Sequence, residues 1–572
     1  LGDVYKRQVY TYAYDAINRL TGKVNPLGAS TQFQYDAKGN LLSSTDANGV
    51  QKTFVYDEID RMISLTDGNG GTTGYGYDEL SRLISMVTPE GNTQEYRYDA
   101  LGRMTKEKDA NGLITEHQYD VMGNLVKSIS PKGAETSYTY DKHDELTSVT
   151  DAMGHVTAYE VDLNRMVTKM IQKNGGEYSY TYDAVHRLTE MTTPLGHKRM
   201  FTYDSADNIV KESDNLGRTS TYQYDIMHRM TKAVNAKGGV TTFGYDIRGN
   251  QNELINAMGY TWKYQYDLID QLTAGVDPEG KATQFTYDLV GNLTAVKKPG
   301  ERTTSYQYDN NYNQTACTET KGYVYQVSYD KDNRMVGTVD PLGQTQAVNY
   351  DAGSRVTAIR DKMGLSQEFT YDAHGNILTR RATDGLMTGY QYDILDRLIK
   401  VTDPMGYETQ YGYDEMGNIT SMTNPQKHVT KYTYDLENNM TSLTSPMGRV
   451  EQFTYDVAGR LESRLTPKGD TIRYDYDKLN GLADKTYEDA KGEETDHPVQ
   501  MGYNAMGQRI SMEDITGESS YTYDGLGRLK TAVNGSGKKV EYVYDEADNL
   551  AGIIYPDGYE AVSYTHLTLP TN

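Results

Sequence analysis

Aspartate is the residue most regularly placed to do chemistry in this sequence, because it follows a tyrosine again and again along the chain. Asp36, Asp99 and Asp141 are examples. Two neighbouring carboxylates can act as a general acid and a general base, as they do in glycoside hydrolysis. Alternatively, each aspartate accepts hydrogen bonds from the backbone of its own turn. Catalysis needs one special pair, whereas the repeat offers 26 equivalent positions. The sequence therefore favours the turn-capping role.

Histidine and cysteine offer weaker candidates. The ten histidines show no metal-ligand spacing such as HExxH, and several stand in polar turn segments, so we expect them to be solvated. Cys317 lies in "QTACTET" without an evident partner, which favours a small half-buried residue over a nucleophile. The sequence contains neither a phosphate-binding "GxxxxGK[ST]" nor a "GxSxG" motif.

Calcium is the one ligand for which the residue types are partly right. "DGNGG" at 67–71 and several "DANG" segments place carboxylate and amide oxygens beside a glycine turn. The bidentate glutamate that completes a calcium loop is missing, and a type I turn requires the same residues. We predict no metal site and no cofactor.

One repeat supplies the elements that position these side chains. The tyrosines before the aspartates stand at multiples of 21 residues, from Tyr14, Tyr35 and Tyr56 to Tyr476. Val161 replaces tyrosine at one position, and the last three intervals are 27, 20 and 21 residues. The chain thus holds 26 units, irregular after about residue 480. A fixed period of this kind predicts a single supersecondary unit repeated along the chain.

Each unit reads as two strands and two turns. Before the first turn, Phe33 and Tyr35 alternate with polar residues, which is typical of a half-buried strand. Asp36 then opens a turn in which Gly39 can adopt positive φ. Other units place Gly, Asn, Asp or His at the position of Gly39, and these types tolerate left-handed geometry. A large apolar residue two positions later, such as Leu83, starts the return strand.

The second turn follows about ten residues later. It reads "NPLG", "TPEG", "SPKG", "DPEG" or "DPMG", with "DANG" and "DAMG" as forms without proline. Asp, Asn, Ser or Thr first, Pro second and Gly fourth is typical of a type I turn. Of 22 such bends, 20 end in Gly, and the exceptions are Glu301 and Lys427.

These patterns predict an all-β fold, a continuous antiparallel β-hairpin meander of about 50 strands with almost no helix. A flat sheet of that length is implausible because strand twist accumulates. We therefore expect the strip to curl, tyrosine face inward, into a hollow spiral shell. The repeat positions for which we predict a structural and not a catalytic role are Tyr14, Tyr35, Asp36, Gly39, Tyr98, Asp99, Gly102, Tyr140, Asp141, Tyr245, Asp246, Gly249, Tyr371, Asp372 and Gly375.

Composition narrows the function classes. A formal net charge of −23 argues against a nucleic-acid-binding surface, which needs clustered lysine and arginine. No apolar run approaches the roughly 20 residues of a membrane-spanning helix, so we expect no membrane insertion. Residues 1–8 ("LGDVYKRQ") and 561–572 break the repeat pattern, and we expect both to be non-native in origin. The β-shell itself is expected to span residues 9–560.

The motif "YxYDxxGRL", present as "YRYDALGRM", "YTYDGLGRL" and "FTYDVAGRL" and followed by "DPxG", resembles the YD repeat of the Rhs family. That family includes bacterial Rhs polymorphic toxins, wall-associated protein A, the C components of insecticidal toxin complexes and teneurins. The resemblance implies a hollow β-shell that encloses a variable C-terminal toxin domain. It also implies a motif region downstream of the repeats, which often cleaves the chain, and the sequence ends without one.

Three function classes follow. In the first, the chain is the encapsulating wall of a secreted bacterial toxin, with its own C-terminal effector, an immunity protein and a secretion apparatus as partners. In the second, it is a cell-surface adhesion module that binds glycan or protein. The third, an enzyme in its own right, is disfavoured because every unusual residue recurs as a turn or core position.

Overall fold

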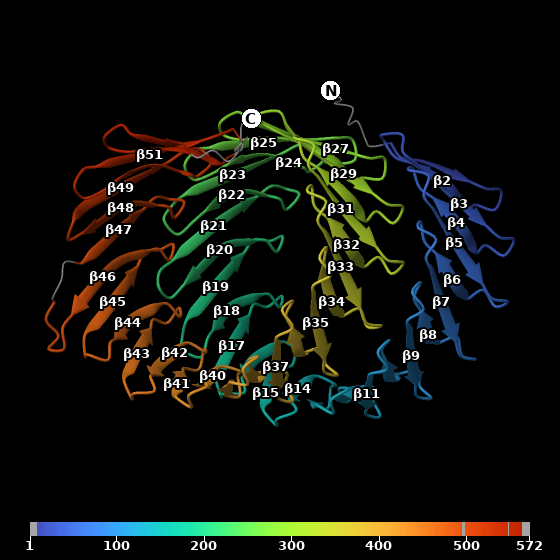
Figure 1. Ribbon diagram of the computed structural model, residues 1–572, viewed down its shortest axis with the longest axis horizontal. Helices are drawn as coiled ribbons and strands as arrows, with labels where there is room; N and C mark the ends of the chain where they lie inside the picture. The colour runs from blue at the N-terminus through green and yellow to red at the C-terminus, as the bar shows by residue number, and fades with distance from the viewer. Residues whose placement is uncertain (1–8, 495–497, 547, 563–572) are drawn as a thin grey trace. The chain divides into compact units, whose positions relative to one another are not determined.

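The computed structural model describes residues 9–494, 498–546 and 548–562. In these ranges the chain forms 53 β-strands and no helix (Figure 1). The predicted all-β fold is confirmed. Within the same ranges there is accordingly no long apolar helix of the kind that crosses a membrane.

Most strands have five or six residues. The first 27 are β1 (Thr11–Tyr14), β2 (Leu20–Val24), β3 (Ser30–Tyr35), β4 (Leu41–Thr45), β5 (Gln51–Tyr56), β6 (Met62–Thr66), β7 (Thr72–Tyr77), β8 (Leu83–Val87), β9 (Thr93–Tyr98), β10 (Met104–Lys108), β11 (Ile114–Tyr119), β12 (Leu125–Ile129), β13 (Glu135–Tyr140), β14 (Leu146–Thr150), β15 (Val156–Val161), β16 (Val167–Ile171), β17 (Glu177–Tyr182), β18 (Leu188–Thr192), β19 (Lys198–Tyr203), β20 (Ile209–Asp214), β21 (Thr219–Tyr224), β22 (Met230–Val234), β23 (Val240–Tyr245), β24 (Gln251–Ile255), β25 (Thr261–Tyr266), β26 (Leu272–Val276) and β27 (Ala282–Tyr287). The others are β28 (Leu293–Lys298), β29 (Arg302–Tyr308), β30 (Gln314–Thr318), β31 (Val324–Tyr329), β32 (Met335–Val339), β33 (Thr345–Tyr350), β34 (Val356–Asp361), β35 (Ser366–Tyr371), β36 (Ile377–Arg381), β37 (Met387–Tyr392), β38 (Leu398–Thr402), β39 (Glu408–Tyr413), β40 (Ile419–Thr423), β41 (Val429–Tyr434), β42 (Met440–Thr444), β43 (Val450–Tyr455), β44 (Leu461–Leu465), β45 (Thr471–Tyr476), β46 (Leu482–Glu488), β47 (Val499–Tyr503), β48 (Arg509–Asp514), β49 (Gly517–Tyr523), β50 (Leu529–Val533), β51 (Lys539–Tyr544), β52 (Leu550–Ile554) and β53 (Glu560–Val562).

Strands pair with their neighbours in the chain, so the predicted antiparallel meander is also confirmed. In the pair β3 and β4, Gln32 lies opposite Thr45, and the register shifts by one residue at Tyr35. The next pair, β4 and β5, keeps an unbroken register. The shift at the tyrosine recurs in the first hairpin of unit after unit, for example at Tyr140. It accommodates the turn that follows.

The first turn, here called the YD turn, is a type I turn closed by a residue at positive φ. The Gly39 N–H donates to the Asp36 carbonyl at 3.3 Å, and the Asp36 N–H donates to the Asn40 carbonyl at 3.0 Å. Gly39 has φ of +107°. At the equivalent position Asn18 and His186 have φ of 64° and 67°, which confirms that this position is constrained by conformation.

The second bend has the same geometry. The Gly28 N–H donates to the Asn25 carbonyl at 2.9 Å, and Gly28 has φ of +85°. The bend that ends at Lys427 keeps this conformation, with φ of 65°, whereas in the bend that ends at Glu301 both Gly300 and Glu301 have positive φ, of 74° and 59°. Both turns of the unit therefore use the same three-residue loop.

The chain divides into two compact units. Unit 1 comprises Leu1–Val156, Tyr266–Ala274 and Gln284–Thr409, and unit 2 comprises Thr157–Gln265, Gly275–Thr283 and Gln410–Asn572. We call residues 9–156 row 1 and residues 284–409 row 2 of unit 1; residues 157–265 are row 3 and residues 410–562 are row 4 of unit 2. Each row has two edges, one formed by YD turns and one by second bends, which we call the YD rim and the bend rim.

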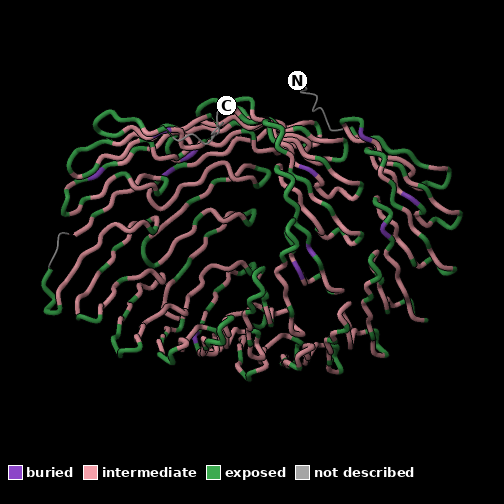
Figure 2. The backbone as a smooth tube through the Cα atoms, in the orientation of Figure 1, coloured by how far each residue is buried: buried purple, intermediate pink, exposed green. Residues whose placement is uncertain are grey.

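Few side chains are fully buried. The buried apolar residues among those described are Ala29, Ala316, Val348 and Ala358, and no large side chain is completely enclosed. Figure 2 shows strands of intermediate burial that end in exposed turns. The sheet is thus held together by its hydrogen-bond ladders and by contacts between consecutive 21-residue repeats more than by a second packed layer.

Two further predictions concern the closure of the strip and the two ends of the chain. The closure of the strip into a hollow shell depends on how the units are placed relative to each other, and it stays a prediction. Of the sequence ranges expected to be non-native, residues 1–8 and 563–572 lie outside the described residues, whereas Ala561 and Val562 belong to β53.

Candidate functional site

The tyrosines of the repeat tie each unit to the one before it. Each ends the first strand of its hairpin, and in the regular part of the repeat its hydroxyl donates to a backbone carbonyl 15 residues earlier, at the start of the preceding return strand. For Tyr503 and Tyr523 the spacing is 21 and 14 residues. The bonds are Tyr35 to Leu20 (2.9 Å), Tyr98 to Leu83 (2.8 Å), Tyr140 to Leu125 (2.9 Å), Tyr245 to Met230 (2.8 Å) and Tyr371 to Val356 (2.5 Å). Tyr14 ends β1 and is exposed.

The aspartates cap their own turns. Asp36 Oδ1 accepts the N–H groups of Gly39 and Asn40, both at 2.8 Å. Asp99 Oδ1 accepts those of Leu101 and Arg103 at 2.9 and 3.0 Å. Asp141, Asp246 and Asp372 accept the equivalent pairs of N–H groups. Gly102, Gly249 and Gly375 close their turns with φ of 82°, 100° and 89°.

Within unit 1, the bend rim of row 1 lies against the YD rim of row 2, and we call this contact the unit 1 seam. Asn48 Nδ2 donates to Asp288 Oδ2 at 2.9 Å, and Asn69 Nδ2 donates to Asp309 Oδ2 at 3.0 Å, each across 240 positions of the chain. The approach is close: a Cβ atom at Gly68 would lie 2.2 Å from the backbone oxygen of Asn310. The third residue of a second bend thus contacts the aspartate of a YD turn.

Lys132 forms the most heavily charged contact of this seam. Its Nζ lies 2.9 Å from Asp372 Oδ2 and 2.8 Å from Asp396 Oδ1. Burial by itself works to raise the pKa of Asp372, but the ion pair with Lys132 and hydrogen bonds from Asn376 outweigh it and lower the pKa to about 2. Asp372 is therefore held ionised by its partners and is unsuited to act as a general acid or base near neutral pH.

A serine, a histidine and an aspartate meet at the same place. His374 Nε2 lies 2.6 Å from Ser130 Oγ, and His374 Nδ1 lies 2.7 Å from Asp396 Oδ2. This is the order of groups in a nucleophilic triad. However, Ser130 Oγ also accepts the N–H of its own turn, from Ala134 at 3.1 Å, and Asp396 is shared with Lys132. The contacts of Ser130 with His374 and of Lys132 with Asp396 join the two rows.

The prediction that the histidines are solvated is wrong for two of them. Only 13% of the His374 side chain and 14% of the His197 side chain are exposed. His374 is covered by residues of the other row, such as Ser130. Because Ser130 lies 244 positions away in the chain, the sequence around His374 does not indicate the contact. His197 lies 3.4 Å from Asp214 in the contact between the rows of unit 2.

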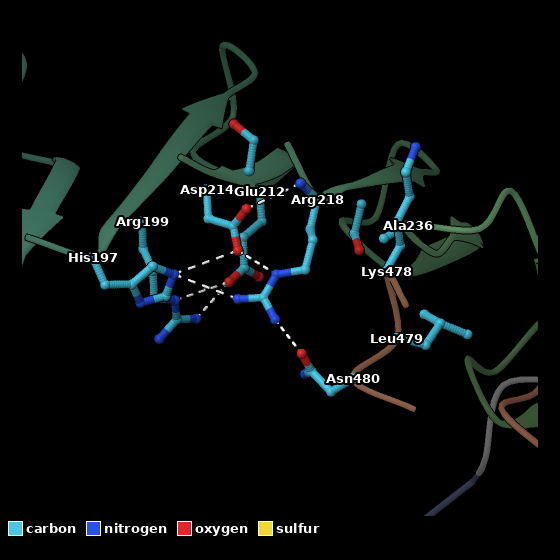
Figure 3. Close-up of a pocket in the computed structure, with 11 residues that line it drawn as sticks. His197, Arg199, Glu212, Asp214, Arg218, Ala236, Lys478, Leu479 and Asn480 are labelled. Atoms are coloured by element: carbon cyan, nitrogen blue, oxygen red, sulfur yellow. Dashed lines mark hydrogen bonds and ion pairs between the residues drawn. The ribbon is translucent and has the colours of Figure 1, made fainter. Parts of the chain in front are cut away.

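In unit 2 the bend rim of row 3 meets the YD rim of row 4, and Figure 3 shows a pocket of about 370 Å³ there. Arg218 lies between Asp214, at 2.5 Å, and Asn480, to which it also donates. Burial works to raise the pKa of Asp214, but the backbone N–H and the guanidinium of Arg218 outweigh it and lower the pKa. Arg199 pairs with Glu212 at 2.5 Å. The two arginines of this pocket are thus paired with its two carboxylates.

The calcium-like segment also belongs to a seam. Asp67 Oδ1 caps its own turn, accepting the N–H of Gly71 at 2.8 Å, and Asp67 Oδ2 accepts Asn311 Nδ2 at 2.8 Å. Across the ranges that the structure describes, no group of three or more His, Cys, Asp or Glu side chains is arranged to hold a metal ion. Cys317 lies half-buried in β30.

Family comparisons agree with this repeat geometry. The Teneurin YD-shell family matches residues 3–159. The RHS Repeat family matches residues 140–198, 203–240, 266–301, 287–324, 371–404, 392–429, 417–450, 434–471 and 523–560, which together cover just over half of the chain. The chain belongs to the RHS repeat family. No curated protein sequence matches it.

Solved structures share the RHS fold. A crystal structure of TcdB2-TccC3-TEV has a TM-score of 0.58 at 14% identity, with 97% of this chain and 34% of that chain covered. TcdB2-TccC3 without its hypervariable C-terminal region gives 0.54 at 13% identity, covering 98% and 34%. TcdB2-TccC3 itself gives 0.51 at 13%, covering 95% and 40%. This chain spans little more than a third of the length of the chains it matches.

One element of the RHS unit was missed by reasoning from the sequence. Arg103 donates to Asp99 Oδ2 at 2.7 Å and to the Asp120 carbonyl at 2.7 Å, and its guanidinium lies 4.9 Å from the centre of the Tyr119 ring. The same contacts recur at Arg61, Arg82, Arg187 and Arg355. The signal was the arginine of "YRYDALGRM", which the motif contains and to which no role was assigned. Where it is present, the arginine links its YD turn to the next tyrosine.

Proposed function

We propose that this RHS repeat chain is the wall of a container that encloses a C-terminal effector domain supplied by a longer protein. The observation that carries the proposal is the uniformity of the repeat: tyrosine and aspartate make the same contacts in repeat after repeat, and an arginine or an asparagine usually follows in the turn. An active site requires at least one unit that differs in its chemistry. The unusual groups at the seams, such as Lys132 and His374, form contacts between rows.

The finer assignment is that of a secreted bacterial polymorphic toxin. Similarity of fold to TcdB2-TccC3 over nearly the whole chain supports it, and so does the existence of a TcdB2-TccC3 structure without a hypervariable C-terminal region. We propose the protein's own effector as the enclosed partner, with an immunity protein and a secretion apparatus as further partners. The net charge of −23 favours solubility and disfavours nucleic acid as a ligand of the wall.

Protease protection tests the proposal in the longer protein. The segment downstream of these repeats should resist protease while the repeats are folded, and it should be digested when that segment is expressed alone. The isolated chain should leave RNA, DNA and peptidoglycan unchanged. If the purified chain degrades one of these, and a point substitution within residues 9–560 abolishes that activity, the proposal fails.

The second candidate is an adhesion module, and the match to the Teneurin YD-shell family favours it. In that case the exposed rows of threonine, serine, glutamine and lysine would bind glycan or a partner protein on a cell surface. Binding of the isolated chain to cells or immobilised glycans, without protection of any downstream segment, would support this function over the container.

A further inference from the structure

The YD rim of row 1 is not covered by another row of unit 1, and most of its turn tips are apolar. The residue three positions after the repeat tyrosine stands at the tip of each YD turn. In row 1 these residues are Ile17, Lys38, Ile59, Leu80, Leu101, Met122 and His143. The five apolar ones expose between 63% and 75% of their surface. A regular row of exposed large apolar side chains is unusual on a soluble protein and marks a binding surface.

The covered YD rim of row 2 has a different composition at the same repeat position. Its residues are Val290, Asn311, Asp332, Gly353, His374 and Leu395. Four of the six are polar or glycine, and they lie against polar residues of the row 1 bend rim. Asn311 donates to Asp67, for example, and the Gly353 N–H donates to Asn111 Oδ1 at 2.9 Å. The seam inside the unit is thus polar, and the apolar tips stand on the uncovered rim.

The opposite edge of unit 1, the bend rim of row 2, shows the same feature. Leu342, Met363 and Met405 occupy the third position of their second bends and expose between 75% and 80% of their surface. The other three bends of this rim have Gly300, Lys321 and Asp384 at that position. In row 1 the third position is mostly polar, with Asn48, Asn69 and Lys132 among its residues, and it is used in the seam. Exposed large apolar side chains therefore occur on both outer rims of unit 1.

These two rims also match in spacing. Successive turns on one rim are two strands apart, which is about 10 Å in any β-sheet, so a partner for this row must repeat at the same interval. A YD rim and a bend rim already meet in this way inside unit 1. We propose that the row 1 YD rim of one copy of the chain docks onto the row 2 bend rim of a second copy.

Such a contact joins two different surfaces, so it does not close on itself. Each added copy presents the same free rim again, and association continues into open-ended assemblies. Because the contact is apolar, a kosmotropic salt such as sulfate strengthens it, whereas the ionic strength of any salt weakens the exposed ion pairs of the seams. Association that grows with sulfate would therefore distinguish the outer rims from charge-driven contacts.

Sedimentation velocity of the full chain over a wide range of concentrations provides the test. We expect the average mass to rise continuously with concentration. Leu80→Ser with Leu101→Ser should weaken association at least tenfold through the YD rim, and Leu342→Ser with Met363→Ser should do the same through the bend rim. Because these side chains are exposed, the circular dichroism spectrum and melting temperature should stay unchanged. Leu395→Ser, at the same repeat position in the covered rim, should leave association intact.

Mixing the two double variants gives the sharpest readout, since each keeps one intact rim. The mixture should form dimers and nothing larger, although each variant alone stays monomeric. A wild-type chain that is monomeric at every concentration overturns the proposal, as does a mixture that remains monomeric. Association that persists unchanged in both variants also overturns it, and it would assign self-association to the strand edges of β1 and β53.

Discussion

The turns "YDALGR" at 98–103 and "YDILDR" at 392–397 have the same backbone and different surroundings. In the first, Arg103 lies 2.7 Å from Asp99, and Leu101 is 75% exposed. In the second, Arg397 lies 2.6 Å from Asp393, and the turn is covered by row 1 through the contact of Arg397 with Met153. The capped turn and its ion pair therefore form whether or not another row is present.

The difference teaches that the strip and its stacking are encoded by separate residues. Tyrosine, aspartate and the positive-φ residue build the strip and are shared by both turns. The tip residue and the third residue of the second bend decide whether a rim accepts another row. Substitutions at the second set should affect covered and free rims unequally. In the first set, only residues that also contact another row, such as Asp372 and Asp396, should do so.

The largest expected effect is at Gly68, where the backbones of the two rows approach closely. In Gly68→Ala the new Cβ would lie 2.2 Å from the Asn310 backbone oxygen, so the rows must separate locally. We expect a loss of about 3 kcal/mol in the free energy of unfolding, measured by urea denaturation. Lys362→Ala, at the same position of a second bend on a free rim, should change it by less than about 0.5 kcal/mol. Equal effects of the two substitutions would refute the distinction.

Lys132 allows the same comparison for charge. Lys132→Met leaves Asp372 and Asp396 without their shared cation, and we expect a loss of about 2 kcal/mol in the free energy of unfolding. Lys38→Met is the control: Lys38 pairs with Asp60 on the free rim, where both side chains are well exposed, and its loss should cost about 0.5 kcal/mol or less. Thermal unfolding of the two variants in parallel measures the difference.

Acid should weaken the seam as Asp372 becomes protonated. The pKa of Asp372 is lowered from 3.8 to about 2. Because the folded-state pKa lies below the unfolded one, the ionised carboxylate stabilises the fold above about pH 4, and this contribution is lost as the pH falls through about 2. Asp372→Asn should flatten the acid dependence of the melting temperature in that window. An unchanged acid profile would show that the carboxylate is not paired.

The smallest difference is expected for the arginines that link a YD turn to the next tyrosine, here called the arginine ladder. Arg103→Gln on the free rim and Arg355→Gln on the covered rim each remove an ion pair with the turn aspartate and a contact with the next tyrosine. Each substitution should cost about 1 kcal/mol, and the two costs should agree closely. A much larger cost at Arg355, measured by urea denaturation, would mean that the ladder depends on stacking after all.

The fold was predictable because its information is local. The spacing of Tyr35 and Asp36 and the residue types at Gly39 and His186 are enough to infer strands, turns and positive φ. The seams were not predictable, since Lys132 and Asp372 lie 240 positions apart and nothing in either segment indicates how many repeats separate two rows that contact each other. For the same reason His374 could not be recognised as covered. The arginine ladder could have been found from the motif, because it spans a single repeat.

In both units a contacting lysine and aspartate of two rows lie 240 positions apart in the chain. Zero-length carbodiimide cross-linking of the dilute chain tests this stacking of rows most directly. This reagent joins a lysine amine to a carboxylate only when the two are in contact. Lys132 lies 2.9 Å from Asp372, and Lys237 lies 2.6 Å from Asp477, the same number of positions further along the chain. Mass spectrometry should find both links within single chains. Links that join Lys132 and Lys237 only to carboxylates of neighbouring repeats, or only to other copies of the chain, would contradict the stacked rows.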